Sequence, residues 1–184
     1  MQVHKTELPG VLLLEPKVFG DARGFFMESY NERTFAQVTS LSPQFVQDNH
    51  SRSGRGVLRG LHYQLKQPQG KLVRVTAGEV YDVAVDVRRS SPAFGRWVGA
   101  HLSAENKRQM WVPAGFAHGY LVLSESAELQ YKATDFYAPA HERGIVWNDP
   151  DLAIGWPLPD GVREPVLSPK DRSAPRLREA ETFP

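Results

Sequence analysis

The chain of 184 residues contains no cysteine, which excludes disulfide bonds, thiolate metal ligands and a cysteine nucleophile. No run of residues approaches the roughly 20 apolar residues of a membrane span, and the N-terminus lacks the apolar core of a signal peptide. The formal net charge is only +1, so no basic field exists for nucleic acid or an anionic membrane. We therefore expect a cytoplasmic protein that holds any anionic ligand with a local cluster of Lys and Arg.

The length allows one domain with a sizeable core and is too short for two. The composition, 41% apolar and 23% charged, is that of a soluble globular protein. After about residue 147 the chain becomes rich in Pro and Asp. We expect a single domain over residues 1–184, in which residues from about 148 onward form an irregular C-terminal extension packed on the rest and frayed from about Ser173.

Short segments rich in Val, Leu, Phe and Tyr dominate the first 134 residues, and turn formers separate them. We expect strands over residues 11–14, 25–30, 45–49, 57–65, 71–77, 79–88, 95–102, 109–112, 117–123 and 127–134. Many short strands without long helices between them predict an all-β jelly roll, as a barrel or a sandwich. A short helix is expected at 31–37, with Asn31 as its N-cap.

Two segments alternate clearly between apolar and polar residues. Successive side chains of a strand point to opposite faces, so in 81–87 we expect Tyr81 and the valines to face the core and the aspartates to face solvent. In 128–133 the same rule places Tyr131 on the interior face with Leu129 and Ala133. A phenol inside the barrel is the first candidate for a chemical role.

A histidine and a lysine are expected beside this tyrosine. We predict that strands 57–65 and 71–77 form a hairpin with the loop 66–70. This pairing would put His62 and Lys71 on one interior face. Arg59 has the opposite parity to His62, so both face inward only if a bulge intervenes, for which Gly60 is suited. The alternative is a core histidine with a satisfied hydrogen bond and a turn lysine that reaches water.

A metal site is the next alternative, because jelly rolls often bind a metal through a His-x-His pair. Here Gln64 occupies the second position, which leaves His62, His118 and the uncertain carboxylate Glu79. A lysine on the same face would repel a divalent cation, so we predict no metal and no cofactor.

A metal-free site for proton transfer next to a carbonyl group remains. Such a reaction needs a base, a cation near the enolate oxygen and an acid on the opposite face. These roles suit His62, Lys71 and Tyr131 respectively. Asp171 is the most attractive carboxylate to orient His62, although spacing alone does not establish this link.

A second cluster is suited to an anion and a flat ring, and the alternative is solvated charges and core aromatics. Its members are Arg23, Arg59, Arg143 and Lys170 for phosphate, and Phe19, Phe26 and Tyr137 for stacking.

The sequence resembles the dTDP-4-dehydrorhamnose 3,5-epimerase family of cupins from about Leu8 to Asp171. The resemblance rests on six motifs, which are highly specific together and in this order: DARGFFME (21–28), QDNHS (47–51), VLRGLHYQ (57–64), GKLVRV (70–75), PAGFAHG (113–119) and WNDP (147–150).

The resemblance implies a cupin-type jelly roll that epimerises C3 and C5 of a dTDP-4-keto-6-deoxyhexose without metal. It implies that His62 is the base with Asp171, that Lys71 supports the enolate and that Tyr131 is the acid. It implies that the nucleotide sugar is bound by Arg23, Phe26, Glu28, Gln47, Asp48, Asn49, Arg59, Lys71, His118, Tyr137, Glu142 and Lys170, with Tyr137 stacked on thymine. The resemblance further implies a homodimer in which an N-terminal strand joins the partner's sheet. Two alternatives stay open: a monofunctional epimerase or isomerase of the same substrate class, and a non-catalytic sugar-binding jelly roll.

Overall fold

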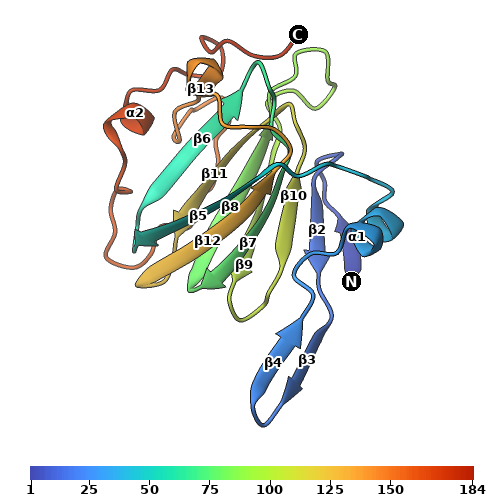
Figure 1. The fold of residues 1–184 in the computed structure, drawn as a ribbon. Coiled ribbons are helices and arrows are strands. Elements are labelled where there is room, and N and C mark those ends of the chain that lie inside the picture. The colour runs from blue at the N-terminus through green and yellow to red at the C-terminus, as the bar shows by residue number, and fades with distance from the viewer.

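Two antiparallel sheets face each other in a computed structural model that describes all residues from 1 to 184 (Figure 1). The elements are β1 (Gln2–Lys5), β2 (Leu12–Glu15), β3 (Val18–Asp21), β4 (Gly24–Met27), α1 (Glu32–Thr39), β5 (Gln47–Gly54), β6 (Leu58–Gln64), β7 (Lys71–Ala77), β8 (Glu79–Asp86), β9 (Trp97–Ser103), β10 (Gln109–Val112), β11 (Phe116–Val122), β12 (Ser126–Ala133), a 3-10 turn (Pro139–His141), β13 (Glu142–Gly144) and α2 (Pro169–Arg172). One sheet has the order β1-β2-β10-β7-β12-β5, and the other has the order β13-β6-β11-β8-β9. The predicted all-β jelly-roll class is confirmed.

The main core fills the space between the two sheets. Its fully buried members include Val73 of β7, Val80 of β8 and Leu129 of β12, and Tyr131 packs against them. The interior position predicted for Tyr131 is therefore confirmed. The predicted helix is also confirmed as α1, where the side chain of Asn31 accepts a hydrogen bond from the backbone N–H of Thr34 at 3.0 Å.

The orientation predicted for β8 is only half right: the valines are buried as expected, but the aspartates do not face solvent. Asp82 and Asp86 are both fully buried, and they lie on the face that also carries the core residues Val80 and Ala84. The opposite face, with Val83 and its odd-numbered neighbours, packs against residues of the C-terminal extension. Because both faces of this strand are covered, alternation alone could not show which face lines the interior.

The hairpin predicted between β6 and β7 is also wrong. Strand β6 pairs with β11 and β13, whereas β7 pairs with β10 and β12 in the opposite sheet. The loop 66–70 thus crosses from one sheet to the other instead of closing a tight turn. His62 and Lys71 still face the same space, because the two sheets enclose it from opposite sides.

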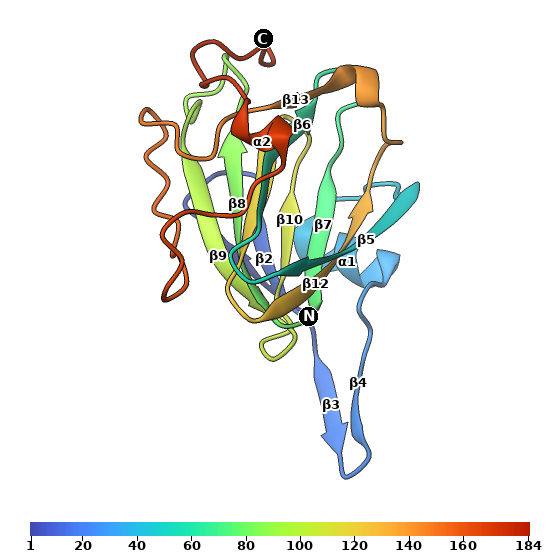
Figure 2. The same ribbon diagram turned by 90° about the vertical axis from the view of Figure 1, so that its left-hand side faces the viewer.

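The C-terminal extension packs along the outside of the five-stranded sheet, and its end lies near the loop after β8 (Figure 2). Leu177 and Ala180 are buried there, and the hydroxyl of Tyr63 donates a hydrogen bond to the backbone carbonyl of Glu181 at 2.5 Å. Phe183 pairs with Arg88 through a β-bridge. The predicted fraying beyond Ser173 is therefore wrong, because this segment supplies the cover that β8 needs.

Strands β3 and β4 form a separate hairpin, called the arm below, which projects away from both sheets (Figures 1 and 2). Phe19, Phe25 and Phe26 lie on it with more than half of their surface exposed, 53%, 62% and 68% respectively. The strand expected at 25–30 is thus present as β4, but it pairs only with β3. None of the helices is long or apolar enough to span a membrane.

Candidate active site

A cavity of about 440 Å³ opens between the two sheets and is called the site cavity below. His62, Lys71 and Tyr131 line it from β6, β7 and β12, and Asp171 lines it from α2. The four residues predicted for proton transfer therefore lie together, although they come from both sheets and the extension.

His62 and Asp171 form a hydrogen-bonded pair. The Nε2 atom of His62 lies 2.5 Å from Oδ1 of Asp171, across 109 residues of sequence. Asp171 is held in place by α2, where its backbone N–H donates to the Oγ atom of the N-cap Ser168 at 3.1 Å. Burial alone would raise the pKa of Asp171, but the hydrogen bond and charge of His62 bring it below the ordinary value. The pair is thus built to keep a carboxylate beside the imidazole.

Lys71 has no hydrogen-bonded acid partner, and its ammonium lies 5.6 Å from the centroid of the Tyr131 ring. Burial lowers the pKa of Lys71 to about 8, although the negative charges of Asp82 and Glu142 oppose this. Burial likewise raises the pKa of Tyr131, and the neighbouring Tyr120 and Glu142 add to the effect. The cavity therefore holds a phenol that stays protonated at neutral pH and an ammonium that is close to losing its proton.

The bulge expected at Gly60 is present. His118 of β11 pairs with His62, but Tyr120 pairs with Arg59, so β6 has one extra residue between these positions. Gly60 has a φ of +122°, and a Cβ atom at this position would lie 2.5 Å from the Cα atom of Gly119. The bulge turns both Arg59 and His62 into the site cavity, as predicted.

Gln64 has a structural role instead of the metal-binding role considered for this position. Its Nε2 atom donates to the carbonyl oxygens of Gln67 and Phe136 at 2.8 and 3.1 Å, and its Oε1 atom accepts from the N–H of Ala138 at 2.9 Å. Glu79 pairs with His101 outside the site cavity. No three His, Cys, Asp or Glu side chains cluster closely enough to hold a metal ion.

Comparison with known proteins agrees with this geometry. The sequence model of the dTDP-4-dehydrorhamnose 3,5-epimerases matches residues 5–179. The chain is 64% identical to the dTDP-4-dehydrorhamnose 3,5-epimerase of Pseudomonas aeruginosa over 184 residues, all of both chains. The chain belongs to the dTDP-4-dehydrorhamnose 3,5-epimerase family. The family, the cupin-like fold and the epimerase activity predicted from the sequence are therefore confirmed.

Two solved epimerase structures are similar to this chain. The dTDP-6-deoxy-D-glucose-3,5-epimerase of Legionella pneumophila, in complex with dTDP-4-keto-L-rhamnose, is 53% identical with a TM-score of 0.93, over 97% of this chain and 93% of that chain. A 3'-monoepimerase from Streptomyces bikiniensis, in complex with dTDP-quinovose, is 37% identical with a TM-score of 0.88, over 95% of this chain and 87% of that chain.

Several residues that the epimerase resemblance assigned to the nucleotide sugar surround the site cavity. Arg59, His118 and Lys170 line it directly. At its edge, Glu142 accepts a hydrogen bond from the hydroxyl of Tyr137 at 2.9 Å and forms an ion pair with Lys170. These residues form one connected polar group beside His62 and Asp171.

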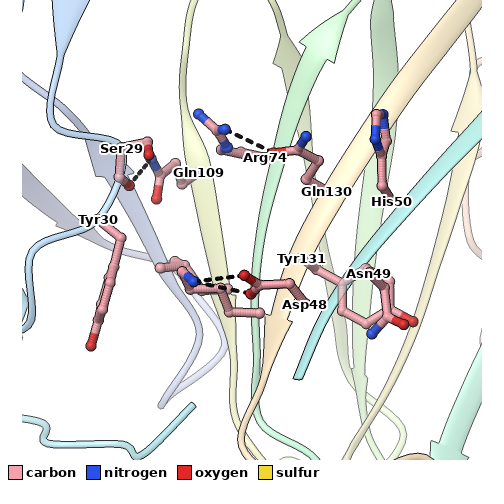
Figure 3. A pocket seen from close by; sticks show the side chains of 11 residues that line it. Ser29, Tyr30, Asp48, Asn49, His50, Arg74, Gln109, Gln130 and Tyr131 are labelled. Atoms are coloured by element: carbon pink, nitrogen blue, oxygen red, sulfur yellow. Dashed lines mark hydrogen bonds and ion pairs between the residues drawn. The ribbon is translucent and has the colours of Figure 1, made fainter. Parts of the chain in front are cut away.

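The three residues 47–49 of β5 do not share one face. The Nε2 atom of Gln47 donates to Oδ1 of Asn49 at 2.9 Å, and the Oε1 atom of Gln47 accepts from the N–H of Tyr137 at 2.9 Å. Asp48 instead forms an ion pair with Lys132 in a pocket on the outer face of the six-stranded sheet (Figure 3). The structure thus does not bring the Asp48 side chain into the site cavity, because the strand alternates at this position.

The last group of residues assigned by the epimerase resemblance lies on the arm and directly after it. Arg23 is paired with Asp21 at the tip of the arm, Phe26 is exposed, and the side chain of Glu28 accepts from Asn31 at 2.9 Å. None of them lines the site cavity of its own chain.

Sequence reasoning missed Ser51, Tyr120 and Asp82. The Oγ atom of Ser51 lies 3.0 Å from the hydroxyl of Tyr120, and both residues line the site cavity. Asp82 lies behind His118, whose Nε2 atom is 2.9 and 3.0 Å from its two carboxylate oxygens. Strand alternation from Asn49 and from His118 could have indicated Ser51 and Tyr120. Asp82 was missed because the aspartates of β8 were expected to face solvent.

Proposed function

We propose that this chain converts dTDP-4-dehydro-6-deoxy-D-glucose to dTDP-4-dehydro-L-rhamnose by epimerisation at C3 and C5, in dTDP-L-rhamnose biosynthesis. The observation that carries the proposal is the convergence of the His62–Asp171 pair, Lys71 and Tyr131 on one cavity. The Legionella relative bound to dTDP-4-keto-L-rhamnose supports the substrate class.

His62 is the base in this reaction. A carboxylate only accepts hydrogen bonds, so Asp171 fixes the proton of neutral His62 on Nε2 and leaves the Nδ1 lone pair free. His62 then removes the proton from the carbon next to the C4 ketone. The negative charge of Asp171 also stabilises the imidazolium that forms.

Lys71 stabilises the charge that this step creates. The electron pair of the broken C–H bond moves to the C4 oxygen and gives an enolate, for which a buried ammonium is a strong partner. In an enclosed site such a charge has more effect than it would in water. The absence of an acid partner leaves the Lys71 ammonium available to the substrate.

Tyr131 returns a proton to the opposite face of the carbon and completes the inversion. Its raised pKa keeps the phenol protonated at neutral pH, as a general acid requires. C3 and C5 are both bonded to the C4 carbonyl carbon, so removal of a proton from either carbon gives an enolate at the same oxygen. The same three residues therefore act at each carbon in turn.

The other residues hold the nucleotide diphosphate. Arg59 and Lys170 are cations at the site cavity that suit the pyrophosphate, and the exposed ring of Tyr137 suits stacking on thymine. His118, Gln47, Asn49 and Glu142 contact the sugar and base, and no cofactor takes part.

The partner of this chain is a second copy. The arm exposes phenylalanine rings that its own chain does not cover, and they support an exchange in which N-terminal strands join the partner's sheet. Arg23, Phe26 and Glu28 then serve the neighbouring site. The outer pocket in Figure 3, where the Oε1 atom of Gln109 is buried without a donor, is consistent with a face that another copy covers.

Residues 1–184 form one domain, since the extension shares a core with β8. We place the protein in the cytoplasm, because a chain without cysteine has no need of an oxidising compartment.

A monofunctional epimerase is the second candidate, because the Streptomyces bikiniensis relative inverts one carbon. Incubation with dTDP-4-keto-6-deoxyglucose in D2O, followed by NMR, separates the candidates. Deuterium at both C3 and C5 with inversion at both carbons is expected. Deuterium at one carbon alone would indicate the monofunctional enzyme, and binding without exchange would indicate a non-catalytic sugar-binding protein.

A further inference from the structure

Asp82 is a buried carboxylate that the reaction described so far does not use. It is fully buried on the interior face of β8, and His118 is its only hydrogen-bond donor. Burying a carboxylate is costly unless several donors compensate for the lost water. Asp82 is therefore poorly compensated for a residue that would only support the fold.

The other fully buried carboxylate of β8 shows what structural compensation looks like. Asp86 accepts hydrogen bonds from the backbone N–H and the guanidinium of Arg88 and from the hydroxyl of Ser91. These bonds hold the turn that follows the strand. Asp82 accepts no backbone N–H and holds no turn. Strands β8 and β11 are already joined by a continuous ladder, so the His118 contact is not needed to pair them.

Two features of the site cavity depend on Asp82. First, its carboxylate requires a proton on Nε2 of His118, so a neutral His118 keeps its lone pair on Nδ1. Second, its negative charge acts on Lys71, whose pKa of about 8 would be lower still without that charge. Glu142 acts on Lys71 in the same sense, and Tyr131 faces it from β12.

We propose that Asp82 is a positioning residue for the epimerisation, which orients the His118 imidazole and supplies the buried negative charge that holds Lys71 as an ammonium beside the substrate ketone. The inference rests on the proposed function, because there Lys71 stabilises the negative charge on the ketone oxygen of the substrate. The charged and titratable residues that line the cavity besides Lys71 and the tyrosines are Arg59, His62, His118, Lys170 and Asp171. Asp82 differs from them because it is fully buried behind His118 and does not line the cavity.

Asp82→Asn tests the charge while it preserves the shape of the side chain. The asparagine carbonyl oxygen can still accept from His118, so KM should change by less than about threefold. The alkaline limb of the kcat profile should move to lower pH by about 1 unit or more, the shift usual for loss of a neighbouring opposite charge. At pH 8 kcat should fall about fivefold or more, because deprotonated Lys71 no longer stabilises the enolate.

Asp86→Asn is the matched control, since Asp86 is equally buried on the same face but pairs with Arg88 at the end of the strand. It should lower the melting temperature and leave the kcat profile in place. An Asp82→Asn profile that overlays the wild type, or moves no more than that of Asp86→Asn, would overturn the proposal.

A measurement on the wild-type protein covers the case in which Asp82→Asn does not fold. Nitrogen-15 NMR of the histidine rings, with His118→Gln to assign the signal, should show a proton on Nε2 of His118. A proton on Nδ1 instead would overturn the role of Asp82. The NMR result does not depend on turnover, whereas a wild-type protein that fails to exchange C3 and C5 would refute the proposed function itself.

Discussion

Tyr131→Phe separates the two proton transfers of the proposed reaction. The change removes one hydroxyl that makes no hydrogen bond within the chain, and it keeps the ring over which the Lys71 ammonium lies. Packing beside Leu129 is also preserved, so stability should stay within about 1 kcal/mol of the wild type. The loss should therefore appear in the chemistry and not in the fold.

The magnitude follows from the parts that remain. His62, Asp171 and Lys71 are untouched, so the enolate still forms and His62 returns the proton to the original face. Deuterium exchange in D2O should persist, while inversion falls roughly 100- to 10,000-fold, the usual loss for a general acid. In contrast, His62→Ala should abolish both exchange and inversion, because no proton is removed.

NMR of the sugar protons follows exchange and inversion in the same sample. His62→Gln is a useful companion to His62→Ala, since an amide N–H can replace the donor that the buried Asp171 would otherwise lose. Equal loss of exchange and inversion in Tyr131→Phe would refute the separate roles, because the tyrosine would then take part in enolate formation.

Three further predictions follow from the same structure. Full activity should survive EDTA, with no stoichiometric transition metal by elemental analysis; activity that is lost on chelation and restored by metal would contradict this. Light scattering should give about twice the chain mass of 20.7 kDa, and a monomer with normal turnover would exclude the proposed partner. Gly60→Ala should destabilise the protein by more than the roughly 1–3 kcal/mol of a strained backbone, because its Cβ would also meet Gly119 at 2.5 Å. Gly24→Ala is the control in thermal melts, since Gly24 has φ +130° with nothing within 4 Å; equal losses in both variants would refute the contribution of the contact.

Local patterns predicted much of the fold and part of the site. Strand alternation placed Tyr131 inside, and the opposite parity of Arg59 and His62 predicted the bulge at Gly60. Both inferences depend on neighbouring residues of one strand, where geometry is determined by the backbone itself. The N-cap of α1 was predictable for the same reason.

Other predictions failed where distant segments decide the outcome. Alternation in β8 separated its two faces, but packing of the extension decided which face lines the space between the sheets. Asp82 was therefore expected at the surface, whereas it is fully buried. Likewise β6 and β7 looked like a hairpin, although each finds its partners in a different sheet.

The sequence by itself determined which segments become strands, where one of them bulges and which residue types are available for proton transfer, because these depend on local periodicity and on side-chain chemistry. Only the tertiary structure brought Asp171 against His62 across 109 residues of sequence. It placed Lys71 across the cavity from this pair, on the six-stranded sheet. It also left the arm without cover in its own chain. Which faces meet is decided by burial of apolar surface over the whole chain, and no local pattern contains that information.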